Sequence, residues 1–171
     1  ETGGTNAYTI TIGTDDAAAS ASDLNSINSL TTAAININNV TSLTSSSLSE
    51  LTTLASNISG FSNTTNITTI AVNDTTIAAD SLAARIDSFD SINGGGKTTN
   101  MTLASGATIN VSSSEITEML ADETAGRLTI SDQKITVDSG SISVSTAKSL
   151  ADTTTGVVTA TIADSRVSAI L

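Results

Sequence analysis

The 171-residue sequence predicts an α/β fold, a solenoid of short parallel strands with one short helix per repeat of about 30 residues. Apolar residues recur at helical spacing in five segments, and Ile or Val alternates with Thr, Ser or Asn between these segments. The first large apolar residues of the last four helical segments are each 34 residues apart: Leu48, Leu82, Ile116 and Leu150. An all-β solenoid is the alternative.

The composition favours an ordered chain with a thin core. Hydrophobic residues make up 38% of the sequence and the mean hydropathy is +0.15, whereas Pro, which is common in disordered segments, is absent. Aromatic residues are only 2%, so the core has to be built from Ile, Leu, Val and Ala. A thin continuous core suits stacked repeats, because each repeat buries its apolar face against its neighbours.

The elements are predicted in a similar order in each repeat: a strand, a polar bend, an amphipathic helix, a Thr-rich turn and another strand. The five repeats are expected at residues 4–38, 39–70, 71–104, 105–133 and 134–171. Helices are expected where apolar side chains form one stripe, at residues 22–30, 48–58, 82–89, 116–120 and 147–150. Strands are expected where apolar and polar residues alternate, at residues 9–12, 35–37, 67–70, 101–103, 109–111, 128–130, 135–137, 142–144, 157–158 and 167–171.

Capping residues predict where the helices begin, because their side-chain oxygens accept hydrogen bonds from the first free backbone N–H groups. The expected N-caps are Ser22, Ser47, Asp80, Ser114 and Thr146. Two segments resemble capping boxes, Ser47-x-x-Glu50 and Ser112-x-x-Glu115. Threonines that follow the helices predict turns into the next strand, at Thr31, Thr64, Thr98, Thr124 and Thr154.

The two ends of the chain suggest a segment excised from a longer protein. Glu1-Thr2-Gly3 matches no repeat and resembles a vector-derived scar, so residues 4–171 are interpreted as a single array. The pattern up to Leu171 is that of a strand, where a solenoid is expected to carry a polar cap. We expect no membrane span in this segment, because it has no sufficiently long apolar run.

Missing residue types exclude several classes of function. The chain has no His and no Cys, which excludes Ser-His-Asp and Cys-His catalysis, disulfides, and ordinary zinc, haem or iron–sulfur sites. A net charge of −11 with 2% aromatic residues is the opposite of a nucleic-acid-binding surface. The sequence therefore predicts neither an enzyme nor a nucleic-acid-binding protein.

Acidic bends are the candidate places for metal ligands in the sequence. Asp15, Asp16, Asp74 and Asp138 lie in oxygen-rich bends of a kind that can supply calcium ligands. The chain has no Asp-x-Asp-x-Asp-Gly loop and no Gly-Gly-x-Gly-x-Asp run, which favours solvated turn carboxylates. We therefore expect no metal site and no cofactor, with calcium at these four residues as the alternative.

Three further patterns carry weak chemical signals. Residues 93–98 end like a phosphate-binding loop, but Ser91 stands where that motif needs Gly, and a helix is expected before this segment rather than after it. Glu115 and Glu118 are i, i+3 neighbours, for which a solvated helix face is favoured over a catalytic pair. Lys148 adjoins Ser149, which is uninformative in a chain so rich in Ser.

Residues 22–27 and 149–162, together with Thr31-Thr32, resemble the degenerate Ser/Thr/Asp-rich repeats of very large secreted bacterial surface proteins of cyanobacterial, haemolysin-like and adhesin-like type. This resemblance implies a secreted or cell-surface location. We expect a spacer or surface-layer segment whose partners are the neighbouring repeats of the parent protein. The alternative is an adhesin or phage-fibre type binding module that recognises a glycan or another copy of itself.

Overall fold

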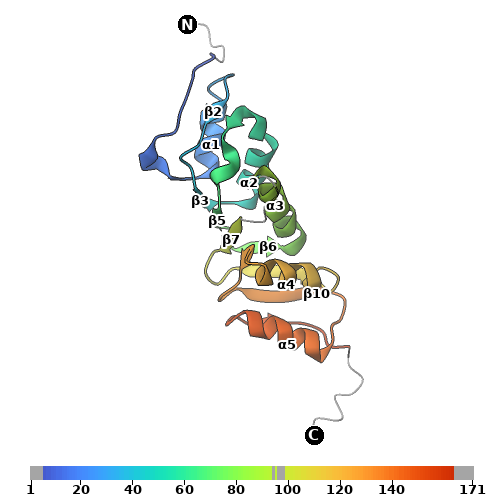
Figure 1. Ribbon diagram of the computed structural model, residues 1–171. Coiled ribbons are helices and arrows are strands. Elements are labelled where there is room, and N and C mark those ends of the chain that lie inside the picture. Colours follow the sequence, from blue (N-terminus) through green and yellow to red (C-terminus); the bar gives the residue numbers. More distant parts are fainter. Residues whose placement is uncertain (1–5, 94, 96–98, 164–171) are drawn as a thin grey trace. The chain divides into compact units, whose positions relative to one another are not determined.

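The computed structural model describes residues 6–93, 95 and 99–163 (Figure 1). Within these residues the chain forms five α-helices and eleven short β-strands. All strand pairings and isolated bridges whose register is described are parallel. The predicted α/β class with parallel sheets is therefore confirmed.

The chain divides into two compact units. Unit 1 consists of Glu1–Asn73 and Ala84–Thr102, and unit 2 consists of Asp74–Ala83 and Leu103–Leu171. The longest helix, α3 (Ala79–Ile92), begins in unit 2 and continues in unit 1.

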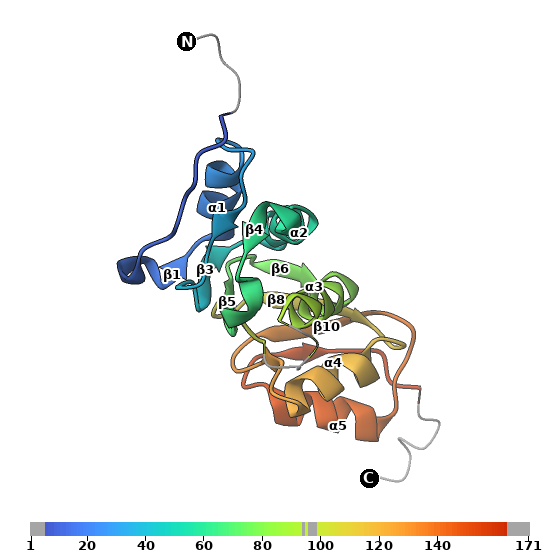
Figure 2. The same ribbon diagram turned by 45° about the horizontal axis from the view of Figure 1, so that its top comes forward.

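Unit 1 contains helices α1 (Ala21–Asn28) and α2 (Leu48–Ser56) and the larger part of α3. Its short 3-10 helices are η1 (Thr14–Asp16), η2 (Ile58–Gly60) and η3 (Thr64–Asn66). Its strands are β1 (Ala18–Ala19), β2 (Ile35–Asn36), β3 (Ser42–Ser46), β4 (Phe61–Ser62), β5 (Thr69–Val72) and β7 (Asn100–Leu103). One sheet has the order β1, β3, β5, β7, the first three of which are labelled in Figure 2, and β2 pairs with β4.

Register in unit 1 places each turn of chain directly beside the next. Ala18 of β1 is opposite Ser42 of β3, and Ser42 is in turn opposite Thr69 of β5. The same register brings Ala19, Leu43 and Ile70 into line, and the last two are buried. Strand β1 therefore lies beside β3, its counterpart in the following turn, and helix α1 contacts α2.

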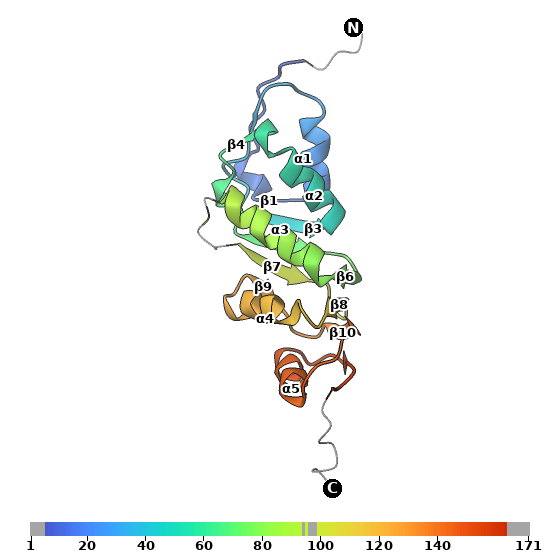
Figure 3. The same ribbon diagram turned by 90° about the vertical axis from the view of Figure 1, so that its right-hand side faces the viewer.

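Unit 2 contains the start of α3, helices α4 (Ile116–Thr124) and α5 (Val144–Thr153), and five strands. The strands are β6 (Thr76–Ala78), β8 (Thr108–Ser112), β9 (Leu128–Thr129), β10 (Lys134–Ser139) and β11 (Val158–Thr159). Four of them form a sheet with the order β6, β8, β10, β11, the first three of which can be followed in Figure 3.

An aliphatic ladder runs across the sheet of unit 2. Ile77, Ile109 and Ile135 occupy equivalent register positions on β6, β8 and β10, and Val158 of β11 continues the line. The three isoleucines are at most 1% exposed. Such β-branched residues pack well on a pleated surface, so the ladder forms the centre of this unit's core.

The predicted helical stripes are largely confirmed. Each helix buries the side chains that share one face, including Leu24, Leu51, Leu54, Leu82, Ile86, Phe89, Ile116, Met119 and Leu150. Leu30 and Ile58, which were expected in these stripes, lie outside the helices, because α1 ends at Asn28 and α2 ends at Ser56. Leu30 is consequently 62% exposed, and Ile58 belongs to η2.

The helix starts confirm one predicted cap and correct the others. Ser47 caps α2, and the capping box with Glu50 is complete. Ser20 rather than Ser22 caps α1, because Asp23 lies three residues later and both its N–H and its carboxylate bond the Ser20 hydroxyl. Likewise Ser143 caps α5, and Thr146 lies inside that helix.

At α3 and α4 the predicted caps also shift. Asp80 is the second residue of α3. Glu115 rather than Ser114 occupies the N-cap position of α4, with no capping hydrogen bond from its side chain. The Glu115 carboxylate does accept a hydrogen bond from the Ser112 N–H at 2.7 Å, so this segment retains half of a capping box.

Three strand predictions need correction. In residues 9–12 only Thr11 forms a bridge, to Asn36, because the chain enters η1 immediately afterwards. The strand expected at residues 67–70 is β5, two residues later. Residues 142–144 are not a strand, because Ser143 starts α5. The piece expected at residues 167–171 lies outside the described residues.

Candidate functional site

Asparagine side chains connect successive turns of unit 1. Asn39 donates from Nδ2 to the Ile12 carbonyl at 2.8 Å, and Asn66 donates to the Asn38 carbonyl at 2.6 Å. Asn93 donates in the same way to the carbonyl of Ile67. The three donors are spaced 27 residues apart in the sequence, so one amide recurs once per turn.

Further asparagines in unit 1 make the same kind of contact. Asn63 donates to the Asn36 side chain at 3.0 Å, and Asn73 donates to the Ser45 carbonyl at 2.8 Å. Between the helices, Asn25 of α1 donates to the Glu50 carbonyl of α2 at 3.0 Å. Their acceptors lie on β2, β3 and α2, so these amides bond neighbouring turns within regular elements as well as in bends.

One buried threonine in each unit, Thr31 in unit 1 and Thr154 in unit 2, bonds the backbone of the preceding turn. Thr31 donates to the Tyr8 carbonyl at 2.8 Å and accepts from the Ala33 N–H at 3.1 Å. Thr154 donates to the Gln133 carbonyl at 2.6 Å and accepts from the Gly156 N–H at 2.9 Å. Each threonine follows a helix, as predicted, and ties the turn after that helix to the preceding turn.

Gln133 is the main cross-turn amide of unit 2. Its side chain is 2% exposed and donates to the Ala104 carbonyl at 3.0 Å, while its Oε1 accepts from the Ser131 N–H at 2.7 Å. Gly156 lies directly against this residue, because a Cβ at position 156 would be 2.3 Å from the Gln133 carbonyl oxygen. Only glycine permits this approach of the two backbones.

Acidic side chains in unit 2 serve local contacts. Asp122 is 2% exposed and forms a salt bridge with Arg127. Asp132 accepts a hydrogen bond from the Ser105 hydroxyl at 2.5 Å. That hydroxyl, followed by the Gly106 N–H, lowers the pKa of Asp132 below its ordinary value.

The four acidic residues considered for calcium lie in three separate segments. Asp15 and Asp16 are exposed in η1 of unit 1. In unit 2, Asp74 lies between β5 and β6, and Asp138 is exposed on β10. Among the described residues, no group of three or more His, Cys, Asp or Glu side chains is arranged to hold a metal ion.

The other predicted patterns are accounted for by local bonding. Lys148 forms a salt bridge with Asp152, and the Ser149 hydroxyl donates to the Ser145 carbonyl of its own helix at 3.2 Å. Glu118 is exposed on α4. The segment 93–98 follows α3, as expected, and most of it lies outside the described residues.

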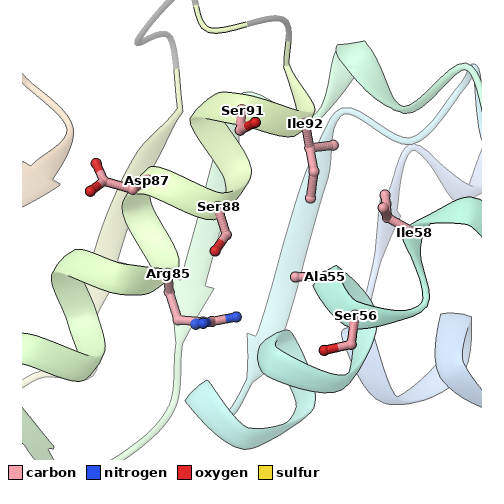
Figure 4. Close-up of a pocket in the computed structure, with 8 residues that line it drawn as sticks. All are labelled: Ala55, Ser56, Ile58, Arg85, Asp87, Ser88, Ser91 and Ile92. Atoms are coloured by element: carbon pink, nitrogen blue, oxygen red, sulfur yellow. The ribbon is translucent and has the colours of Figure 1, made fainter.

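A hollow of about 550 Å³ lies in unit 1 between the end of α2 and α3 (Figure 4). The α2 side contributes Ala55, Ser56 and Ile58, and the α3 side includes Arg85, Ser88 and Ile92. Figure 4 shows the Arg85 guanidinium extending from α3 towards α2, and the lining also includes Asp87 and Ser91 of α3. The hollow combines one cation, one carboxylate, several hydroxyls and a small apolar surface.

Arg85 differs from the ion-paired cations of unit 2. Arg127 pairs with Asp122 and Lys148 pairs with Asp152, but Arg85 has no ion pair or hydrogen bond to any residue that the structure describes. Arg85 is nevertheless half-buried. In a chain with 17 acidic and 6 basic residues, a half-buried guanidinium without a carboxylate partner is a distinctive feature.

Sequence reasoning did not select either the asparagine series or Arg85. The equal spacing of Asn39, Asn66 and Asn93 is a visible signal, but the helical period of 34 residues conceals it. Arg85 carries no motif around it, and only the packing of α3 against α2 distinguishes it from a solvated side chain.

Comparison with known proteins finds no match to a protein-family model, to a curated protein or to a solved structure. In the described part of the chain, none of the helices has the length and apolar character that a membrane span requires.

Proposed function

We propose that this chain is a structural repeat module of a large extracellular protein, acting as a spacer or surface-layer segment. The observation that carries the proposal is the parallel register, in which each turn of 23–32 residues lies directly beside the next within its unit. Stacked turns of this kind contact mainly their neighbours, so that length can be added without a larger core.

The cross-turn hydrogen bonds supply the mechanical part of this role. Asn39, Asn66 and Thr31 in unit 1, and Gln133 and Thr154 in unit 2, each join side chains to the backbone of an adjacent turn. A net charge of −11 keeps neighbouring molecules apart and the segment soluble. A secreted or cell-surface location belongs to the same proposal and rests on the resemblance to bacterial surface repeats.

Small-angle X-ray scattering of the chain tests the proposal. A compact globule of 171 residues has a radius of gyration of about 16 Å. A spacer built from stacked turns is expected to give a clearly larger value and an asymmetric pair-distance distribution. A radius at the globular value with a symmetric distribution would overturn the spacer role.

A further inference from the structure

We infer that the hollow between α2 and α3 is a binding site for a sugar acid, meaning a saccharide unit with one carboxylate and several hydroxyl groups. This inference is independent of the spacer proposal, because it concerns a surface site within unit 1. The volume of about 550 Å³ lies within the usual range of about 300–1,000 Å³ for small-molecule sites. A short oligosaccharide fits this space.

Arg85 determines the charge of the ligand. Its guanidinium lies in the hollow without an acidic partner among the described residues, and its N–H groups match the two oxygens of a carboxylate. One cation, with the Asp87 carboxylate in the same lining and a net charge of −11 over the chain, disfavours ligands with several negative charges. The site therefore suits a single carboxylate better than a phosphate or a polysulfate.

Ser56 and Ser88 offer hydrogen-bond acceptors to the hollow, which favours a ligand with hydroxyl donors. The Ser56 hydroxyl donates to the Thr52 carbonyl at 2.9 Å, and the Ser88 hydroxyl donates to the Ala84 carbonyl at 2.7 Å. Their protons are therefore engaged within α2 and α3, and their oxygens are left as acceptors. Sugar hydroxyls are suitable donors for such acceptors, whereas a simple carboxylate such as acetate has no donor.

The apolar part of the lining completes the match. Ala55, Ile58 and Ile92 offer small aliphatic surfaces beside the polar groups, as Figure 4 shows. The C–H faces of a sugar ring can pack on such surfaces. Because the hollow contains no aromatic residue, we expect an affinity in about the millimolar range, as is usual for a site with few strong contacts.

Nuclear magnetic resonance titration of the isotope-labelled full chain tests the inference with three probes: D-glucuronate, D-glucose and acetate. We expect glucuronate to shift the Arg85 Nε–Hε signal and the amides of residues 55–58 and 85–92. Glucose, which lacks the charge, and acetate, which lacks the hydroxyls, should each bind about tenfold or more weakly. Equal binding of glucuronate and either of the other probes would overturn the assignment.

Variants of Arg85 distinguish ligand binding by this side chain from a purely structural role. Arg85→Gln should abolish the shifts caused by glucuronate, and Arg85→Lys should weaken binding, because Lys lacks the planar fork. Lys148→Gln is the matched control, since it removes one positive charge from α5 and leaves the hollow unchanged. If Arg85→Gln fails to fold, Arg85→Lys decides. Unchanged glucuronate binding in the variant that folds, or an absence of shifts in the unmodified chain, would contradict the proposal.

Discussion

Units 1 and 2 share parallel topology but differ in what joins one turn to the next. In unit 1, β1, β2 and β4 are only two residues long, and asparagine side chains bond the backbone of adjacent turns. In unit 2, β8 and β10 have five and six residues and carry the isoleucine ladder. In unit 1, side-chain amides therefore add hydrogen bonds between turns that the short strand pairings do not supply.

Shortening the isoleucine ladder of unit 2 should have the largest effect. Ile109 is fully buried between Ile77 and Ile135, so Ile109→Ala removes apolar contact and leaves a cavity. We expect the free energy of unfolding to fall by about 2–5 kcal/mol, measured by urea denaturation. Leu30→Ala, at a side chain that is 62% exposed, should change it by less than about 0.5 kcal/mol. Similar losses in the two variants would contradict the ladder.

Adding a side chain at Gly156 should have the next largest effect on the free energy of unfolding. Gly156→Ala places a Cβ 2.3 Å from the Gln133 carbonyl oxygen, which forces the two backbones of unit 2 apart. A loss of about 1–3 kcal/mol is expected in the same measurement. Gly13→Ala in unit 1 is the matched control, because its Cβ would meet nothing within 4 Å. Equal losses of stability in the two variants would show that the backbones at Gly156 and Gln133 do not need this close approach.

Removing a single cross-turn amide should cost less. Asn66→Ala deletes the donor to the Asn38 carbonyl in unit 1, for an expected loss of about 0.5–1.5 kcal/mol. Faster hydrogen exchange of neighbouring amides should accompany it. Asn110→Ala on β8 of unit 2 is the control, since no hydrogen bond is described for that side chain, and it should stay within about 0.5 kcal/mol. If the control were the more damaging change, unit 1 would not depend on its amides.

The capping box of α2 should produce the smallest effect, with a pH dependence. Ser47 N–H and Ser47 hydroxyl bonds lower the pKa of Glu50 below its ordinary value of 4.5. The stability that the ionised Glu50 carboxylate contributes is present above pH 4.5. It is lost as the pH falls through the lowered pKa of Glu50. Ser47→Ala should therefore cost about 1 kcal/mol at neutral pH and less in acid.

A second cap provides the comparison for this pH dependence. Ser143 caps α5 through the Thr146 N–H, and the residue three positions after it carries no titratable group. Ser143→Ala should thus cost a similar amount with little change between neutral and acidic pH. Parallel pH profiles for the two variants, measured by thermal unfolding, would show that Glu50 has no part in the cap.

The sequence predicts the helices better than the strands. The stripes through Leu51, Ile86 and Ile116 have the helical period and are buried in the structure, because a helix is defined by contacts close in sequence. The short strands depend on partners 23–32 residues away, which the local pattern does not contain. Residues 142–144 alternate like a strand, but Ser143 caps a helix.

The candidate sites depend even more on tertiary contacts. Thr31 and Thr154 could be predicted as turn residues, but their bonds to the preceding turn could not, since the acceptors are backbone carbonyls. The series of Asn39, Asn66 and Asn93 is visible in the sequence only to a reader who already knows the turn length. Arg85 becomes notable only when α2 is placed beside α3.

The most direct test of the stacked-turn account is the deletion of residues 108–133, one complete turn. The deletion joins Ala107 to Lys134, so that β10 can take the place of β8 beside β6. We predict a folded chain with an unchanged circular dichroism signal per residue and a cooperative unfolding transition. Deletion of residues 108–120, about half a turn, should abolish folding of unit 2 although it removes less chain. Loss of the cooperative transition in both deletions would contradict the account.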